Sequence, residues 1–267
     1  STTTLTADNT VFDGSSTAGI WTSGSTTTLT DVTVSEVTGL PGFLDSVGGW
    51  GVVVRSDDFE AEALTVRNVK RIGVFVKSSL ATINDLSISN VDSTESGLAG
   101  RGLHISGFTE DESYVSVDNA VIQNVADAGI FIRNATEVNL ADISIEDVVP
   151  ATLETESPDD TTYDMHVVPV ETGDGLVVVQ RNAEGDPAAA ENVIVNLTGV
   201  NNFINIARAG VIADSSTLNL FEIPETMESG MADGSFFVTQ HSGELNLIVL
   251  DMELIACVTT LELDDAE

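Results

Sequence analysis

Seven side chains that suit ligand binding recur at fixed places in short segments that begin with glycine. If the first and third residues after each glycine point into a core, the second and fourth point outward. The outward positions include three aromatic residues, a histidine and three of the nine basic residues of the chain, namely Trp21, Arg55, Phe75, Lys77, His104, Phe131 and Arg133. Aromatic faces stack on sugar rings, and Arg and Lys bind carboxylates or sulfates. This candidate row therefore predicts binding of an extended ligand such as an acidic glycan.

A second interpretation of the same row is burial beneath neighbouring loops. Arg55 and Lys77 would then pair with Asp57, Asp58 or acidic loop residues. Exposed apolar patches are rare unless they are functional, so both alternatives stay open.

Other candidate chemistry is weaker. The pair Asp57-Asp58 is followed by Glu60 and Glu62, and a solvated acidic turn is a better interpretation of this stretch than a catalytic carboxylate pair. His104 lies near Arg101 but has no evident catalytic partner. We therefore predict no catalytic residue and no metal-ligating residue.

Acid-rich loops offer a site for a cation. Glu110-Asp111-Glu112 and Asp159-Asp160 could hold calcium that orders a loop, although the chain has no EF-hand loop and no regular calcium-binding repeat. Apart from this possible loop-bound calcium, we expect no cofactor.

The glycine-led segments themselves form a repeat. They start at Gly19, Gly51, Gly73, Gly102, Gly129 and Gly175, and Gly210 starts a weaker copy. Subtracting these numbers gives steps of 32, 22, 29, 27, 46 and 35 residues. The shortest step is the bare coil of a solenoid, and the longer steps carry insertions. Each glycine is expected to allow a sharp bend between two strands.

A second element precedes most of the glycines and alternates apolar with polar residues, as in Leu64-Thr-Val-Arg-Asn-Val69. Asn68, Asn90 and Asn124 occupy its corner, where stacked coils would align them into a hydrogen-bonded ladder in left-handed backbone. A third, weaker run includes Leu80 to Ile83. Three short strands per coil of about 22–30 residues predict an all-β, single-stranded parallel β-helix.

Four insertions interrupt the coils, near residues 38–49, 92–100, 107–113 and 149–172. Most leave from the same corner, so they should gather along one edge of the solenoid. No linker separates the halves of the chain. We expect residues 1–267 to form a single β-helix domain that is a segment of a longer chain.

Composition restricts the partners. The net charge is −34, from 43 acidic and 9 basic residues. Such a surface keeps a protein soluble and repels nucleic acid and anionic membranes, so neither nucleic-acid binding nor membrane insertion is expected. Hydrophobic residues make up 42% of the chain and aromatic residues 5%, which predicts an aliphatic core.

The repeated pattern Leu-x-Val-x-Asn-Val followed by Gly-Ile-x-Ile resembles the right-handed parallel β-helix, or pectate-lyase-like, superfamily. The resemblance covers about Leu29 to Ile223 and implies the fold, but it includes lyases, hydrolases, epimerases, adhesins and tailspikes. The Asn-Thr-Asp and Gly-His-Gly motifs of the polygalacturonases are absent. The chain therefore resembles a non-catalytic member.

Two classes of function follow. The first is an extracellular or cell-surface solenoid: a stalk, an adhesin or a glycan-binding segment. The second is a carbohydrate-active enzyme, a polysaccharide lyase or glycoside hydrolase, with its cleft on the glycine-led strands. Neighbouring domains, or end-to-end copies of the chain, are further expected partners because the ends of a solenoid are open.

Overall fold

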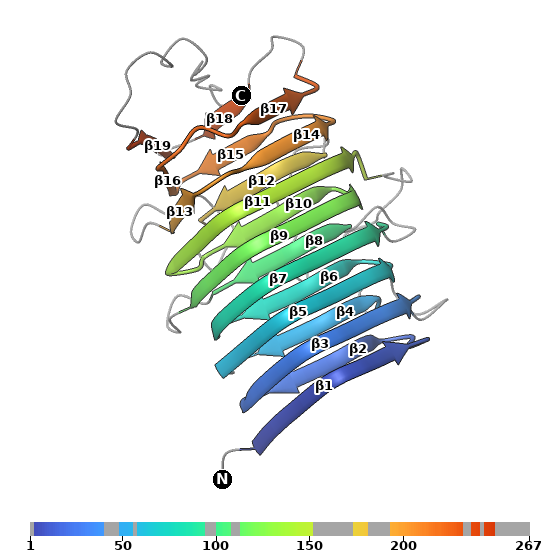
Figure 1. The fold of residues 1–267 in the computed structure, drawn as a ribbon. Helices are drawn as coiled ribbons and strands as arrows, with labels where there is room; N and C mark the ends of the chain where they lie inside the picture. Colours follow the sequence, from blue (N-terminus) through green and yellow to red (C-terminus); the bar gives the residue numbers. More distant parts are fainter. Residues whose placement is uncertain are drawn as a thin grey trace, which may run out of the picture.

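The protein is an all-β parallel solenoid in a computed structural model that describes residues 3–39, 48–55, 58–93, 100–107, 113–151, 173–180, 193–231, 236–240 and 243–248. Its strands stack into two facing sheets (Figure 1). All of the pairings between these strands are parallel. The expectation of a parallel all-β solenoid is confirmed.

Within the described residues, the long-strand sheet has eleven strands. They are β1 (Thr3–Asp13), β3 (Ser25–Val37), β5 (Asp58–Val69), β7 (Leu80–Val91), β9 (Tyr114–Ala126), β11 (Glu137–Val149), β13 (Ile194–Thr198), β14 (Asn202–Ile206), β16 (Thr217–Leu220), β17 (Thr226–Ser229) and β19 (Glu244–Leu247).

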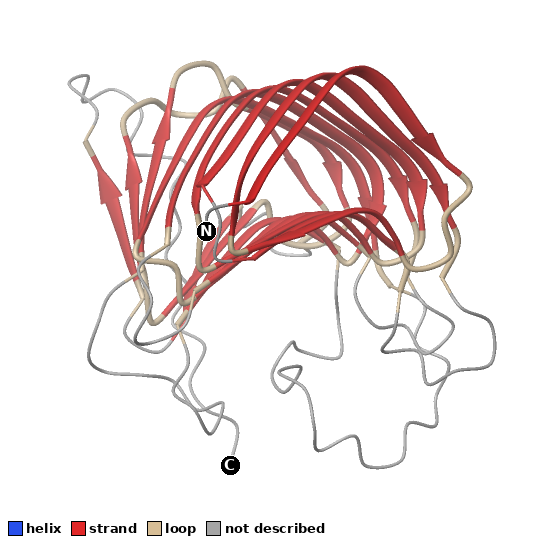
Figure 2. Cartoon of the chain, turned by 90° about the horizontal axis from the view of Figure 1, so that it is seen from below, coloured by secondary structure: helices blue, strands red, loops and turns tan. Residues whose placement is uncertain are grey.

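In the part of the chain that the structure describes, the short-strand sheet has eight strands, and the glycine-led segments lie along it. They are β2 (Ala18–Ser23), β4 (Trp50–Arg55), β6 (Ile72–Lys77), β8 (Arg101–Ser106), β10 (Ala128–Arg133), β12 (Asp174–Val179), β15 (Val211–Asp214) and β18 (Phe237–Gln240). Seen along the stack, the long-strand sheet arches over the short-strand sheet (Figure 2).

The core between the sheets is aliphatic and built from columns, as the alternation predicts. Ile122, Val125, Ile130 and Ile132 are fully buried in one continuous cluster, which confirms their predicted core positions. The register also confirms the bare coil, because Thr3 pairs with Ser25 and Asp58 pairs with Leu80, 22 residues apart in each case.

The glycines have a different role from the predicted one. None of those that lead the short strands has a positive φ, so they do not make a bend. They lie inside the strands and face the core, where a Cβ on Gly73 would approach the carbonyl oxygen of Gly102 and the Cγ2 atom of Ile88, each to 2.7 Å. Glycine is required because the next strand of the same sheet and a side chain of the facing sheet both approach closely at this column.

The predicted asparagine corner is present. Asn68, Asn90 and Asn124 have φ values of 54°, 56° and 54° at equivalent registers. Asn90 Nδ2 donates to Asn68 Oδ1 at 2.8 Å, and Asn68 Nδ2 donates to Glu36 Oε1 at 2.6 Å. These bonds run from coil to coil along the stack.

A second corner changes the predicted strand count. Positive φ values also occur at Asp31, Ala63, Asp85, Asn119 and Asp142, which align in register within long strands. The chain turns there without leaving the sheet. The weak run Leu80–Ile83 and the element that ends in Val91 are therefore one bent strand, β7, and the expectation of three separate strands per coil is wrong.

A second ladder lies on the outside of the long-strand sheet. Asn196 Nδ2 donates to Asn139 Oδ1 at 2.8 Å, Asn219 Nδ2 to Asn196 Oδ1 at 2.9 Å, and Asn246 Nδ2 to Asn219 Oδ1 at 3.1 Å. This ladder joins four successive strands in the half of the chain where the glycine repeat weakens.

Asn196→Ala should therefore lower the free energy of unfolding by about 1 kcal/mol, since it removes two ladder bonds at a solvent-accessible position. Ser116→Ala is the control, because Ser116 is exposed in the same row and pairs in register with Asn139. Its expected loss is below about 0.5 kcal/mol. Denaturant unfolding measures both, and equal losses would contradict a stabilising role for the ladder.

Candidate functional site: the outer face of the short-strand sheet

The candidate row lies on the side of the short-strand sheet that faces away from the core. Residues at its two ends differ in burial. Trp21 and Arg55 are exposed, with Trp21 47% accessible. Phe75, Lys77 and His104 are half-buried, whereas Phe131 and Arg133 are buried. An accessible row is therefore present over β2 and β4, and it becomes covered toward β10.

A second apolar cluster explains the burial at the far end. Phe131 packs with Val177, Val179, Ile212 and other small apolar side chains on the outside of β10, β12, β15 and β18. This cluster is separate from the core between the sheets. Phe131 and Arg133 are thus buried, as the second interpretation of the row expects, and Phe131 belongs to a cluster separate from the core between the sheets. The predicted covering insertions lie largely outside the described residues.

Three rings form an aromatic column across β6, β8 and β10. The His104 ring centroid lies 4.9 Å from that of Phe75 and 5.0 Å from that of Phe131, both in edge-to-face geometry. The parallel register places the three side chains directly beside one another. Edge-to-face packing is the favoured geometry for such pairs.

Burial and nearby cationic side chains keep the imidazole of His104 neutral. Burial, followed by the charges of Arg101, Arg133, Arg71 and Lys77, lowers the pKa of His104 well below its ordinary value. Its Nδ1 lies 3.4 Å from Nη1 of Arg101, and a guanidinium group can only donate. In the neutral ring, the proton therefore resides on Nε2.

Buried hydrogen-bond donors on this face lack an acceptor among the described residues. They include the Nε2 atom of His104 and the Nε1 atom of Trp50. A buried unsatisfied donor costs about 1–3 kcal/mol.

Rings and cations also meet at the accessible end. Trp21 and Trp50, the two tryptophans of the chain, have ring centroids 5.4 Å apart. The guanidinium carbon of Arg71 lies 5.3 Å from the Trp50 ring, and that of Arg55 lies 5.9 Å from the Trp21 ring. Aromatic surface beside positive charge suits a ligand that carries rings and acidic groups.

Two carboxylates on this face are paired with arginines. Arg101 Nε donates to Asp127 Oδ2 at 2.8 Å in a buried ion pair, and Arg101 also lies 3.6 Å from the Phe131 ring centroid. Arg208 Nε donates to Asp174 Oδ1 at 2.7 Å. Burial raises the pKa of Asp174, and the bonds from Arg208 and the Ala209 N–H oppose that effect. Both carboxylates are therefore held by arginine side chains and are poorly placed for acid–base chemistry.

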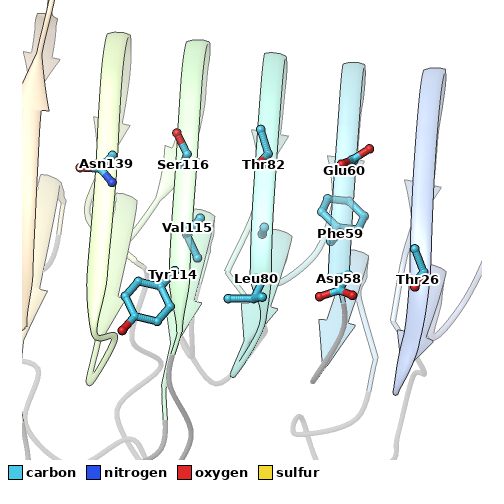
Figure 3. Close-up of a pocket in the computed structure, with 11 residues that line it drawn as sticks. Thr26, Asp58, Phe59, Glu60, Leu80, Thr82, Tyr114, Val115, Ser116 and Asn139 are labelled. Atoms are coloured by element: carbon cyan, nitrogen blue, oxygen red, sulfur yellow. The ribbon is translucent and has the colours of Figure 1, made fainter. Parts of the chain in front are cut away.

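A shallow groove of about 490 Å³ lies on the other sheet, along the starts of β3, β5, β7, β9 and β11 (Figure 3). Its polar and apolar lining side chains include Asp58, Glu60, Leu80, Thr82, Tyr114, Ser116 and Asn139. Asp58 is the first residue of β5, and Glu60 and Glu62 are exposed along the same strand. The predicted acidic turn is therefore a strand face, while Asp57 lies outside the described residues.

A metal site needs several His, Cys, Asp or Glu side chains close together. No group of three or more His, Cys, Asp or Glu side chains that could hold a metal ion occurs among the described residues. The acid-rich loops at Glu110–Glu112 and Asp159–Asp160 lie outside them. Within the described part, no helix is long and apolar enough to cross a membrane.

The fold defines the class of this protein as an all-β parallel solenoid. No protein-family model, no curated protein and no solved structure matches the chain.

Proposed function

We propose that the protein is a non-catalytic extracellular or cell-surface solenoid that binds an extended acidic glycan on the outer face of its short-strand sheet. The observation that carries this proposal is the exposed Trp21 ring, which lies beside the Trp50 ring and the Arg55 guanidinium at the accessible end of the face. An acidic sugar would stack on the exposed ring and bring a carboxylate to Arg55.

The distribution of charge supports an anionic ligand. Six of the nine basic residues lie on this face or at its edge, in a chain of net charge −34, namely Arg55, Arg71, Lys77, Arg101, Arg133 and Arg208. Two of the six, Arg101 and Arg208, are paired with Asp127 and Asp174. Concentrated positive charge on an otherwise acidic protein steers an anion to one place. The exposed Trp21 ring offers the adjacent stacking surface.

Tryptophan fluorescence tests the proposal directly, because both tryptophans lie at the proposed site. Polygalacturonate or chondroitin sulfate should shift the emission in a saturable and salt-sensitive manner, and neutral dextran should not. Arg55→Gln should weaken binding about 5–10-fold, the loss expected for one charge-assisted hydrogen bond at an accessible position.

Arg67→Gln is the matched control. It removes the same charge from an exposed position on the long-strand sheet, and it should change affinity less than about twofold because long-range charge effects are screened. Equal responses of the two variants, or no response to either acidic polymer, would contradict the proposal.

The groove in Figure 3 favours a second candidate, a carbohydrate-active enzyme. Asp58 and Glu60 are two carboxylates on one strand face, and the exposed Tyr114 ring lies two strands away in the same groove. Glycoside cleavage requires a pair of carboxylates. Incubation with a panel of uronate polysaccharides, followed by assays for unsaturated products and reducing ends, tests this candidate. If the protein cleaves one of these polymers and Asp58→Asn abolishes the cleavage, the enzyme candidate replaces the non-catalytic proposal.

A further inference from the structure

The groove on the long-strand sheet exposes two large apolar side chains. Leu80 and Tyr114 pair in register on β7 and β9 and are 52% and 38% exposed. Leu80 also pairs with Asp58 on its other side, so a carboxylate, an aliphatic side chain and an aromatic ring follow one another in one row (Figure 3). A second row beside it consists of Glu60, Thr82 and Ser116 and offers a carboxylate and two hydroxyl groups.

The strands that form this groove carry negative charge only. Five carboxylates and no lysine or arginine occur in residues 25–30, 58–62, 80–84, 114–118 and 137–141, and they belong to Asp58, Glu60, Glu62, Asp118 and Glu137. The alternation of exposed and buried residues along β5, β9 and β11 places these side chains on the outer side of the sheet. The groove therefore lies in a region of negative potential.

The two carboxylates of the groove are not neutralised by the protein within the described ranges. None of the ion pairs between described residues involves Asp58 or Glu60, and both are exposed. On the short-strand sheet, in contrast, Asp127 and Asp174 are held by arginines. A cation that enters the groove would therefore meet carboxylates that are free to pair with it.

This combination of side chains determines which occupant fits. Uronate chains and nucleic acids are repelled by the carboxylates. A lysine or arginine side chain is attracted both to a carboxylate and to the face of a tyrosine ring, and Leu80 needs an apolar contact as well. A polypeptide in which basic and apolar residues alternate supplies both kinds of contact, and its backbone can hydrogen-bond with Thr82 and Ser116.

The length of the groove sets the length of the segment. The groove crosses β3, β5, β7, β9 and β11, and strands about 4.8 Å apart give a span of about 19 Å from first to last. An extended chain of about six residues covers that span.

We propose that the groove on the long-strand sheet binds an extended cationic segment of another polypeptide, about six residues long, which lies across the strands. The two binding sites differ in place and in charge, because the acidic-glycan site lies on the outer face of the other sheet. The segment-binding site therefore does not depend on the function proposed above.

A labelled hexapeptide of alternating lysine and valine is the probe. Its fluorescence anisotropy should rise saturably as the full chain is added, and its affinity should fall with added salt. A hexapeptide of alternating glutamine and valine should bind at least about tenfold more weakly, because it lacks the charge-assisted bonds.

Leu80→Lys tests whether the peptide binds in the groove. The new ammonium group would stand beside Asp58 and repel the lysines of the peptide, so the affinity should fall at least about tenfold. Val121→Lys is the matched control, because it makes the same change of charge at a residue that is 37% exposed on the same sheet, seven residues after Tyr114 on β9. It should lower the affinity less than about threefold, since charges at that distance are screened.

Equal losses for the two lysine variants would show general attraction to an acidic protein and would overturn the proposal, as would the absence of saturable binding. Full competition by spermine, with the same response to Leu80→Lys, would assign the groove to a polyamine instead of a polypeptide. Arg55→Gln should leave peptide binding unchanged, so a failure here is separate from a failure of the acidic-glycan site.

Discussion

Arg101→Met is expected to lower the free energy of unfolding by about 3–5 kcal/mol, the loss typical of removing one partner from a buried ion pair. The Arg101 and Asp127 side chains are 8% and 6% exposed, and the Nε–Oδ2 distance is 2.8 Å. Methionine keeps the unbranched stem but leaves the Asp127 carboxylate buried without its cation. It also removes the guanidinium group that lies 3.6 Å from the Phe131 ring centroid.

Two comparisons isolate the buried charge as the cause. Lys70→Met removes one member of an exposed ion pair with Asp92, whose side chains are 48% and 73% exposed, so its expected cost is below about 0.5 kcal/mol. Arg101→Met combined with Asp127→Asn removes both buried charges and should recover much of the loss, giving a large coupling energy in a double-mutant cycle. Asparagine suits residue 127 because its φ is 88°.

Denaturant unfolding is measured on five chains: the parent, Arg101→Met, Asp127→Asn, the double variant and Lys70→Met. Similar losses for Arg101→Met and Lys70→Met would show that the buried pair contributes little. Additive losses in the double variant would assign the effect to packing rather than to charge.

The sequence was sufficient to predict the coil and the direction of its side chains, because both depend on local alternation. Ile130 and Ile132 are buried while Trp21 is exposed, as the positions after each glycine indicate. The asparagine corner was also predictable, because asparagine tolerates the left-handed backbone that Asn68 and Asn90 adopt.

The second corner was missed although the sequence carries a signal for it. Asp31, Asp85, Asn119 and Asp142 each stand directly before the first apolar residue of the alternating element, at aligned positions. Ala63 breaks this pattern with the same positive φ. The stack imposes the left-handed conformation at Ala63, where its own side chain gives no local indication.

The partners of the site residues could not be predicted, because alternation specifies a face of a sheet and not its neighbours. Arg101 pairs with Asp127, 26 residues away, and Arg208 with Asp174, 34 residues away. The burial of Phe131 depends on a cluster contributed by β12, β15 and β18. Such contacts depend on the lengths of the intervening segments, which the repeat does not determine.

Gly73→Ala is expected to destabilise the protein by about 3 kcal/mol, at the upper end of the cost of overpacking a core. The added methyl group would lie 2.7 Å from the Gly102 carbonyl oxygen and 2.7 Å from the Ile88 Cγ2 atom. Ile88 could adjust its side chain. The carbonyl group cannot, because β8 is fixed by pairing with β6 and β10, so relief requires the coils to move apart.

Gly24→Ala is the control that separates the steric overlap of an added Cβ from the strain of a left-handed backbone. Gly24 has a φ of 63° and nothing within 4 Å of an added Cβ, so alanine there should cost about 1 kcal/mol through the left-handed backbone alone. Gly73 has no positive φ, and its cost should come from contact. Equal decreases in the free energy of unfolding for the two variants would contradict the view that close contacts of an added Cβ explain the glycine at residue 73.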